Sequence, residues 1–448
     1  MTIIKPGISE ETIREISKIR QEPEWLLDWR LSAFSAWKKM TEPHWAEIDY
    51  EPIDYDALQY FKSSAPAAPS DDLTAIYDRL KIPKHEQAAL MGMAVDVVED
   101  SESVNTSLSE ELAARGIIFL PFSKAVLEYP DLVRENLGSV VGATDNFFAA
   151  LNASVFSDGT FVHVPAGVKC PVDLASYFRI NTANIGQFER TLIIAEPGAE
   201  LSYLEGCSAP RRPNHQLHSG VVEVIVKDGA TVKYSTVQNW FAGDKDGRGG
   251  ILNFVSKRGR VGRDAKLLWT QLEIGSAKTW KYPSSILAGE NAHSDFYSLA
   301  ITRGTQQADT GTKMVHIGNN STSNIMSVGV ALENSKQTFR SLVSFSPNTV
   351  GAKNASNCDT KIIGDFAVAN TLPTILHSNG ENVSGHEAAT SAISDAALFY
   401  LGAQGINRND ATALIVGGMA APVLSRLPME FLVESKHLIK LALENEHA

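Results

Sequence analysis

The first sixty residues carry apolar positions at the spacing of amphipathic helices. Ser9 can cap a helix whose first turn contains Glu10 and Glu11. Apolar residues then recur at every fourth position, and they are Trp25, Trp29, Ala33 and Trp37. Because residues four apart share one helix face, we expect this stripe to pack in a core. A segment rich in Pro, Ala and Ser at 62–72 predicts a linker inside an N-terminal helical region that covers 1–115.

The middle of the chain alternates short β-rich runs with Gly, Asn and Asp turns. A small residue followed four positions later by an aromatic residue recurs along it. The pairs are Ala199/Tyr203, Ala230/Tyr234, Ala265/Trp269 and Ala292/Phe296, with Ser335/Phe339 as a candidate later copy. A recurrence of about 30 residues favours stacked coils that share one core, whereas a β-sandwich has turn signals at about 8–12 residues without it. The sequence therefore predicts a mostly β protein with a right-handed parallel β-helix over 116–387.

Helical spacing returns in the last part of the chain, 388–448. Asp410 can cap a helix, and four apolar residues further on line one helix face. They are Met429, Leu432, Ile439 and Leu443. Because so short a tail cannot build a core of its own, we expect it to pack on the end of the solenoid or on a partner.

The net charge of −12 and the pI near 5.4 argue against nucleic acid or an anionic membrane as a partner, because both are negative. We find no apolar run near the ~20 residues of a membrane helix and no signal-peptide core. A cytoplasmic location is therefore expected. Only three cysteines are present, and they are far apart, which excludes a disulfide framework or a C-x-x-C zinc site. If one of them matters, it matters as a thiol.

Local motifs do not support a hydrolase or a dehydrogenase, and we expect no enzymatic activity. The chain has no G-x-x-x-x-G-K-[ST] loop for a nucleotide. Thiol, imidazole and carboxylate groups that suit soft or borderline metals are present at Cys207, Cys358, His386 and Glu387. Cys170 is interpreted as a small packed residue. One alternative is a β-helix carbohydrate-active enzyme with paired carboxylates such as Asp295 and Asp309.

Seven long segments carry a more specific signal. They are "FSDGTFVHVPAGVKCPVDLASYFRIN", "GQFERTLIIAEPGAELSYLEGCSAP", "VKYSTVQNWF", "QADTGTKMVHIG", "SNCDTKIIGD", "HEAATSAIS" and "LPMEFLVESKHLIKLALE". Together they resemble the SufB/SufD family of the SUF iron–sulfur cluster assembly machinery, from about Ile8 to the C-terminus. The combination of "YLEGCSAP" with "SNCDT" is similar to the SufB pattern rather than the SufD pattern.

The resemblance implies a β-helix scaffold on which a nascent, transient iron–sulfur cluster is built. It implies a SufC-like ATPase and a SufD-like subunit, or a second copy of the chain, as partners. Sulfur would come as a persulfide from a cysteine desulfurase, directly or through a SufE- or SufU-type carrier. Flavin binding is possible for such proteins, but no motif here indicates it. A SufD-like structural partner without cluster chemistry stays open as an alternative.

The resemblance also assigns roles to residues. The sulfur-accepting cysteine falls on Cys207 and the cluster-building cysteine on Cys358, with His386 and Glu387 nearby. The sulfur route falls on Arg179, Asn181, Thr236, Gln238, Trp240 and Lys257. Because alternate strand residues share a face, Arg179 and Asn181 should point to one face, and so should Thr236, Gln238 and Trp240. Both groups are expected to line the inside of the β-helix. Arg179 and Lys257 are expected to lower thiol pKa values there.

Overall fold

A computed structural model describes most of the chain. The described residues are 2–63, 87, 90, 93–100, 102–180, 182, 185–209 and 211–443. The linker predicted at 62–72 lies outside them apart from Lys62–Ser63, which form the short strand β2 and pair with β1 (Thr2–Ile3). Asn181 also lies outside the described residues.

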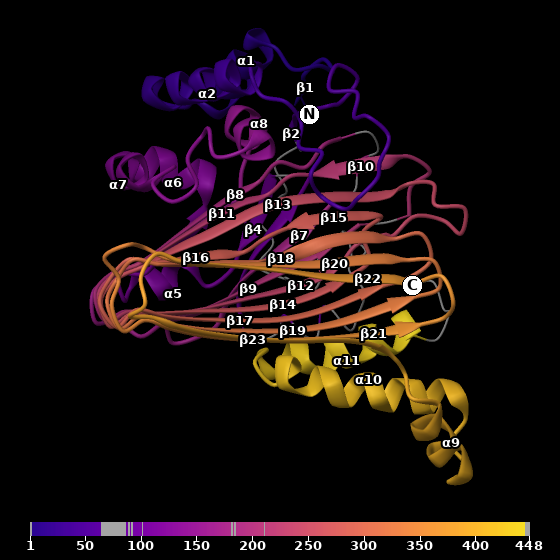
Figure 1. The fold of residues 1–448 in the computed structure, drawn as a ribbon. Coiled ribbons are helices and arrows are strands. Elements are labelled where there is room, and N and C mark those ends of the chain that lie inside the picture. Colours follow the sequence, from indigo (N-terminus) through magenta and orange to yellow (C-terminus); the bar gives the residue numbers. More distant parts are fainter. Residues whose placement is uncertain are drawn as a thin grey trace.

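The centre of the molecule is a parallel β-solenoid of about seven turns, which confirms the predicted fold class (Figure 1). Two sheets face each other, and the chain contributes strands to them in turn. The 11-stranded sheet contains β5 (Ile118–Pro121), β6 (Thr160–Val164), β8 (Arg190–Ala195), β10 (His215–His218), β11 (Val221–Val226), β13 (Gly250–Val261), β15 (Lys278–Lys281), β16 (Ser284–Leu287), β18 (Gln307–His316), β20 (Lys336–Phe345) and β22 (Val368–His377).

The 10-stranded sheet forms the opposite wall. It contains β3 (Ala94–Glu99), β4 (Glu102–Thr106), β7 (Leu174–Arg179), β9 (Glu200–Ser208), β12 (Thr231–Asn239), β14 (Lys266–Ile274), β17 (His293–Thr302), β19 (Thr322–Leu332), β21 (Lys353–Ile363) and β23 (Val383–Ala392). Strands β4 and β5 at the first end pair antiparallel with their neighbours, and the pairs from β6 and β7 onward are parallel.

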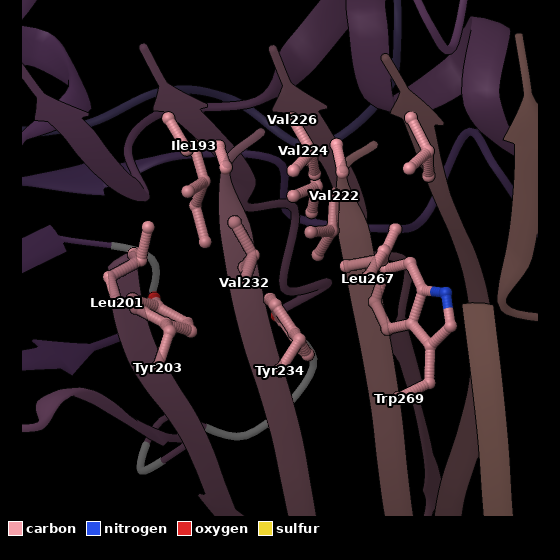
Figure 2. Packing of buried hydrophobic residues seen from close by; sticks show 14 of the residues in the cluster. Ile193, Leu201, Tyr203, Val222, Val224, Val226, Val232, Tyr234, Leu267 and Trp269 are labelled. Carbon is pink, nitrogen blue, oxygen red and sulfur yellow. The ribbon is translucent and has the colours of Figure 1, made fainter. Parts of the chain in front are cut away.

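The aromatic repeat marks the stacking of the coils. Tyr203, Tyr234, Trp269 and Phe296 are directly in register on β9, β12, β14 and β17. They point inward with the small aliphatic residues around them, and Figure 2 shows the first three on adjacent strands. Phe339 is not a later copy, because it lies on β20 in the other sheet and approaches Phe296 across the interior.

Helices cover the outer face of the 11-stranded sheet. They are α1 (Glu10–Arg20), α2 (Glu24–Trp37), α6 (Phe122–Glu128), α7 (Pro130–Asn136) and α8 (Phe147–Val155), while the short α5 (Ser109–Ala113) precedes β5. Ser9 caps α1 by accepting from the Thr12 amide at 3.1 Å, as predicted. The apolar helix α8 is buried throughout its length, so helical structure continues well beyond 115. Strands β3 and β4, conversely, already belong to the solenoid.

The C-terminal helices lie against the outer face of the 10-stranded sheet (Figure 1). They are α9 (Asp395–Ala403), α10 (Arg408–Leu424) and α11 (Met429–Leu443). Leu432, Ile439 and Leu443 pack against an apolar cluster that includes outward residues of the strands, so the predicted stripe serves the flank of the solenoid rather than its end. The cap of α10 is Asn407, whose side chain accepts from the Asp410 amide, so Asp410 lies in the first turn instead.

The last coil leaves one end of the solenoid open. Strands β22 and β23 end the two sheets, and most of their residues are exposed on both faces. Large apolar side chains there, Leu376 and Val383, are half exposed or more. Unpaired strand edges with apolar side chains are ready sites for pairing with another chain. Among the described residues, no helix is long and apolar enough to cross a membrane.

Candidate functional site

Cys207 lies inside the solenoid, in a cluster of buried polar side chains. It belongs to β9, is 2% exposed and has two polar neighbours. Its Sγ donates to Glu205 Oε1 at 3.8 Å and accepts from Gln238 Nε2 at 3.9 Å. Apolar side chains, among them Phe178 and Trp240, pack on its other side. The thiol is therefore held between a carboxylate, an amide and an apolar wall.

The carboxylate of Glu205 is the centre of this cluster. It accepts from Lys257 Nζ at 2.6 Å and from the Tyr234 hydroxyl at 2.5 Å. Burial alone would raise the pKa of Glu205, but Lys257, Lys281 and these hydrogen bonds bring it to about 2. Glu205 is thus an anion at neutral pH.

Lys257 lowers the pKa of the Cys207 thiol as predicted, but other effects outweigh it. Burial is the largest effect and raises the pKa of Cys207 well above its usual range, and the neighbouring Glu205 carboxylate raises it further. Lys257 opposes this shift, but its ammonium group contacts Glu205. The resting thiol is consequently protonated, and a group that stabilises its thiolate is needed to make it a nucleophile.

Four of the six predicted route residues lie at this cluster, and a fifth, Arg179, points to the opposite face of its strand. Thr236, Gln238 and Lys257 face inward, and the Trp240 ring packs against Cys207. Phe178 is in register with Cys207, so strand alternation projects Arg179 toward the opposite face, where its Nη1 donates to Ser208 Oγ at 2.7 Å. Asn181, the sixth, is outside the described residues.

A column of polar side chains runs along the interior between Cys207 and Cys358. The strand registers place its members directly above one another, one from each successive coil. They are Glu205, Thr236, Gln271, Ser298, Ser327 and Cys358. Gln271 Nε2 donates to Ser298 Oγ at 2.9 Å within it. Five strand-to-strand steps separate β9 from β21, which corresponds to about 24 Å.

Cys358 lies next to the open end of the solenoid. It is inward-facing and 2% exposed, and its Sγ is 3.8 Å from His386 Nε2 on the last strand, β23. Burial raises the pKa of Cys358 to about 12. His386 is in register with the inward Ser356, whereas Glu387 is in register with the outward Asn357. The predicted set of Cys358, His386 and Glu387 therefore does not converge within one chain.

Several interior residues were missed from the sequence. Besides Glu205, Gln271, Ser298 and Ser327, they include His218, Asn253, Glu273 and Lys281, which are buried with Cys207 or close to its neighbours. The polar column could have been predicted from the aromatic repeat. Each repeat aromatic is followed two positions later by a residue on the same face, and those residues are Glu205, Thr236, Gln271 and Ser298.

The carboxylates of the alternative enzyme do not form a pair. Asp295 lies on β17 with His293 and Asn324 as partners, whereas Asp309 lies on β18 in the other sheet and holds Tyr282 and Arg340. Paired carboxylates for glycoside hydrolysis must flank one bond at a short separation. Cys170 is partly buried against the core cluster, in agreement with a packing role.

Two models of one protein family match this chain. Residues 178–419 match the family model "SUF system FeS cluster assembly, SufBD core domain", and residues 17–174 match "SufBD protein N-terminal region". The chain therefore belongs to the SufBD family of iron–sulfur cluster assembly proteins.

Curated relatives are similar over nearly the whole chain. An iron–sulfur cluster assembly SufBD family protein of Synechocystis is 50% identical over 98% of this chain and 94% of its own. A chloroplastic SufBD family protein of Arabidopsis thaliana is 46% identical over 98% of this chain and 81% of its own. The iron–sulfur cluster assembly protein SufB of Bacillus subtilis is 38% identical over 98% and 93%. A role in iron–sulfur cluster assembly follows from this membership.

Proposed function

We propose that the chain is a SufB-type scaffold that accepts sulfane sulfur at Cys207 and conducts it to Cys358, where a nascent cluster is built. The polar interior column carries this proposal, because buried hydroxyl and amide groups are costly unless they serve a purpose. The column joins two thiols that are too far apart to exchange sulfur directly.

Sulfur acceptance is a thiol exchange. The Cys207 thiolate attacks the outer sulfur of a persulfide held by a desulfurase or by its carrier, and the donor thiolate leaves. Hydrogen-bond donors such as Gln238 and cations such as Lys257 and Lys281 favour an anionic persulfide in the interior. Sulfane sulfur must gain two electrons to become cluster sulfide, so a reductant, for example a reduced flavin, is required from outside the residues described here.

The cluster site is proposed to be shared between two chains. Cys358 and His386 supply two ligands beside the open end of the solenoid, and the described residues contain no group of three or more metal-ligating side chains. A SufD-like subunit or a second copy of the chain, paired on β22 and β23, would cover the edges and complete the ligand set. Glu387 points away from Cys358 within this chain, so we assign it no ligand role there.

An ATPase of the SufC type is proposed to dock on the C-terminal helices. The groove between α10 and α11 has mostly apolar walls, which include Leu414. Leu414 on α10 and Val433 on α11 remain 58% and 70% exposed. Phe399 and Tyr400 on α9 extend the exposed apolar surface. A patch of this kind marks a protein partner. Because the sequence has no phosphate-binding loop, the energy of ATP has to come from that partner.

Complementation with single-thiol variants tests the proposal. Cys207→Ser and Cys358→Ser should each fail to restore cluster assembly in a strain that lacks this pathway, whereas the matched control Cys170→Ser should restore it. The iron and sulfide bound to the purified complexes of the two inactive variants should also decrease, compared with the wild-type complex. Full activity of Cys358→Ser would remove the scaffold role and leave a SufD-like structural subunit.

A further inference from the structure

A buried histidine, His218, faces two hydrogen-bond acceptors. It ends strand β10 and is fully buried. Its Nε2 contacts the carboxylate of Glu189, and its Nδ1 lies 2.7 Å from Asn253 Oδ1. A neutral imidazole has one N–H and can satisfy one acceptor, while an imidazolium donates from both nitrogens. The arrangement is that of a doubly protonated ring.

From Asn253 a hydrogen-bond chain crosses the interior to Cys207. Asn253 Nδ2 donates to Gln238 Oε1 at 2.6 Å, and Gln238 Nε2 donates to Cys207 Sγ at 3.9 Å. Every donor in the chain points the same way, from the imidazolium toward the sulfur. The chain starts on the 11-stranded sheet and ends on the 10-stranded sheet, so it joins the two walls.

The direction of this chain depends on the charge of the ring. If His218 lost the proton on Nδ1, that nitrogen would become an acceptor, and Asn253 would have to turn its amide to donate to it. Gln238 would then turn as well, and its oxygen rather than its N–H would face Cys207. A donor facing the sulfur favours a thiolate or persulfide anion, and an oxygen facing it favours the neutral thiol.

The surrounding charges support the protonated ring. The charged side chains that face this region are Glu189, Glu205, Glu273, Lys257 and Lys281. Lys257 pairs with Glu205 and Lys281 with Glu273, which leaves His218 as the partner of Glu189. Burial alone would lower the pKa of His218, but Glu189, with smaller help from Asn253 and Glu205, raises it above its ordinary value.

We propose that protonated His218 is a positioning residue for sulfur acceptance, aiming the Gln238 amide at Cys207 through Asn253 and so stabilising the anionic sulfur. This inference rests on the proposed role of Cys207. Burial of the thiol and the neighbouring Glu205 carboxylate both raise the pKa of Cys207. A correctly aimed Gln238 amide opposes them by stabilising the thiolate. In this proposal Gln238 contacts the sulfur directly, while His218 acts on it only through the hydrogen-bond chain.

The test measures the reactivity of Cys207 against pH in a Cys170→Ser/Cys358→Ser chain, in which Cys207 is the single thiol. The probe is methyl methanethiosulfonate, which transfers a methylthio group to a thiolate and releases a sulfinate, and mass spectrometry follows the product. A change in access would scale the rate equally at every pH. A change in thiol pKa would move the profile along the pH axis.

His218→Gln should move the profile toward higher pH and slow the reaction at least tenfold at a fixed pH near neutrality. Gln238→Met, which keeps the His218–Glu189 pair and a similar volume, should do the same, and it decides the matter if the first variant does not fold. His316→Gln is the matched control, because His316 is also buried but its two ring nitrogens bond to the hydroxyls of Ser321 and Ser323. Unshifted profiles for His218→Gln and Gln238→Met would overturn the inference.

Failure of the proposed function is distinguishable from failure of this inference. If Cys207→Ser still assembles clusters, the proposed function fails whatever the reactivity profiles show. If Cys207→Ser is inactive while the His218 and Gln238 variants keep the unshifted profile, only the positioning role falls.

Discussion

Replacing Lys257 by Met should strongly destabilise the protein, because it breaks the ion pair beneath Cys207. Lys257 Nζ lies 2.6 Å from Glu205 Oε1, and both groups are buried. Burial lowers the pKa of Lys257, with Glu205 offsetting only part of the effect, so the intact pair contributes little net stability. Without the cation, however, Glu205 would remain a buried anion that keeps hydrogen bonds from the Tyr234 hydroxyl and the Cys207 thiol and the more distant charge of Lys281, but no ion-pair contact.

The size of the loss follows from two independent arguments. Breaking a buried pair by removing one partner typically costs about 3–5 kcal/mol. The pKa of Glu205 near 2, compared with the usual 4.5, corresponds to about 3 kcal/mol, which is the sum that its stabilising partners contribute beyond the cost of burying the carboxylate. Since Lys281 supplies part of that sum, we expect a decrease of about 3 kcal/mol in the free energy of unfolding.

Urea unfolding of Lys257→Met measures this change. Lys227→Met is the matched control, because Lys227 contacts Glu196 at a similar 2.7 Å but is partly exposed, where such pairs contribute about 0–1 kcal/mol. Adding Glu205→Gln to Lys257→Met should recover most of the stability by removing the stranded charge. A loss below about 1 kcal/mol for Lys257→Met would refute the reasoning that Glu205 depends on this cation.

Three further outcomes are expected. Leu414→Glu with Val433→Glu should abolish capture of the ATPase subunit in a pull-down while leaving the melting temperature nearly unchanged, and retained capture would refute the docking surface. We expect ATP binding by the ATPase to open the partner interface that covers Cys358. Cys358 in the assembled complex should therefore resist alkylation in the absence of ATP and be alkylated in its presence, and equal labelling in both states would contradict this opening. Because the folded pKa of Glu205 lies below its unfolded value of about 4.5, its stabilisation is complete above about that pH and is lost as the pH falls toward 2. Glu205→Gln should lack that component of acid unfolding, and an unchanged acid profile would speak against it.

The solenoid could be predicted from the sequence because its repeat is carried by large side chains. Tyr203, Tyr234, Trp269 and Phe296 must stack for the interior to fill, and this requirement leaves a visible spacing in the chain. The buried helix α8 lacks such a signal. It is buried on all sides and mostly apolar, so it shows no clear amphipathic period from which to recognise a helix.

The site could be predicted only in part, because orientation depends on register. Alternation correctly groups Thr236 with Gln238, but it cannot tell which face of β7 is inward, and Arg179 lies on the face opposite to Cys207. Adjacent residues such as His386 and Glu387 fall on opposite faces for the same reason. The ionisation state of Cys207 depends on burial and on Glu205, and neither is visible before the coils are stacked.

The most direct test of the central claim is to follow sulfur from Cys207 to Cys358. The complex is loaded with a labelled persulfide, and peptide mapping measures the label at each thiol over time. Transfer to Cys358 should occur in the wild-type chain, vanish in Cys207→Ser, and slow at least tenfold in Ser298→Val/Ser327→Val, which makes the two column positions before Cys358 apolar. Ser202→Val, on the outward face of β9, should transfer normally. Label that reaches Cys358 at the wild-type rate in the column variant, or in the absence of Cys207, would contradict the interior route.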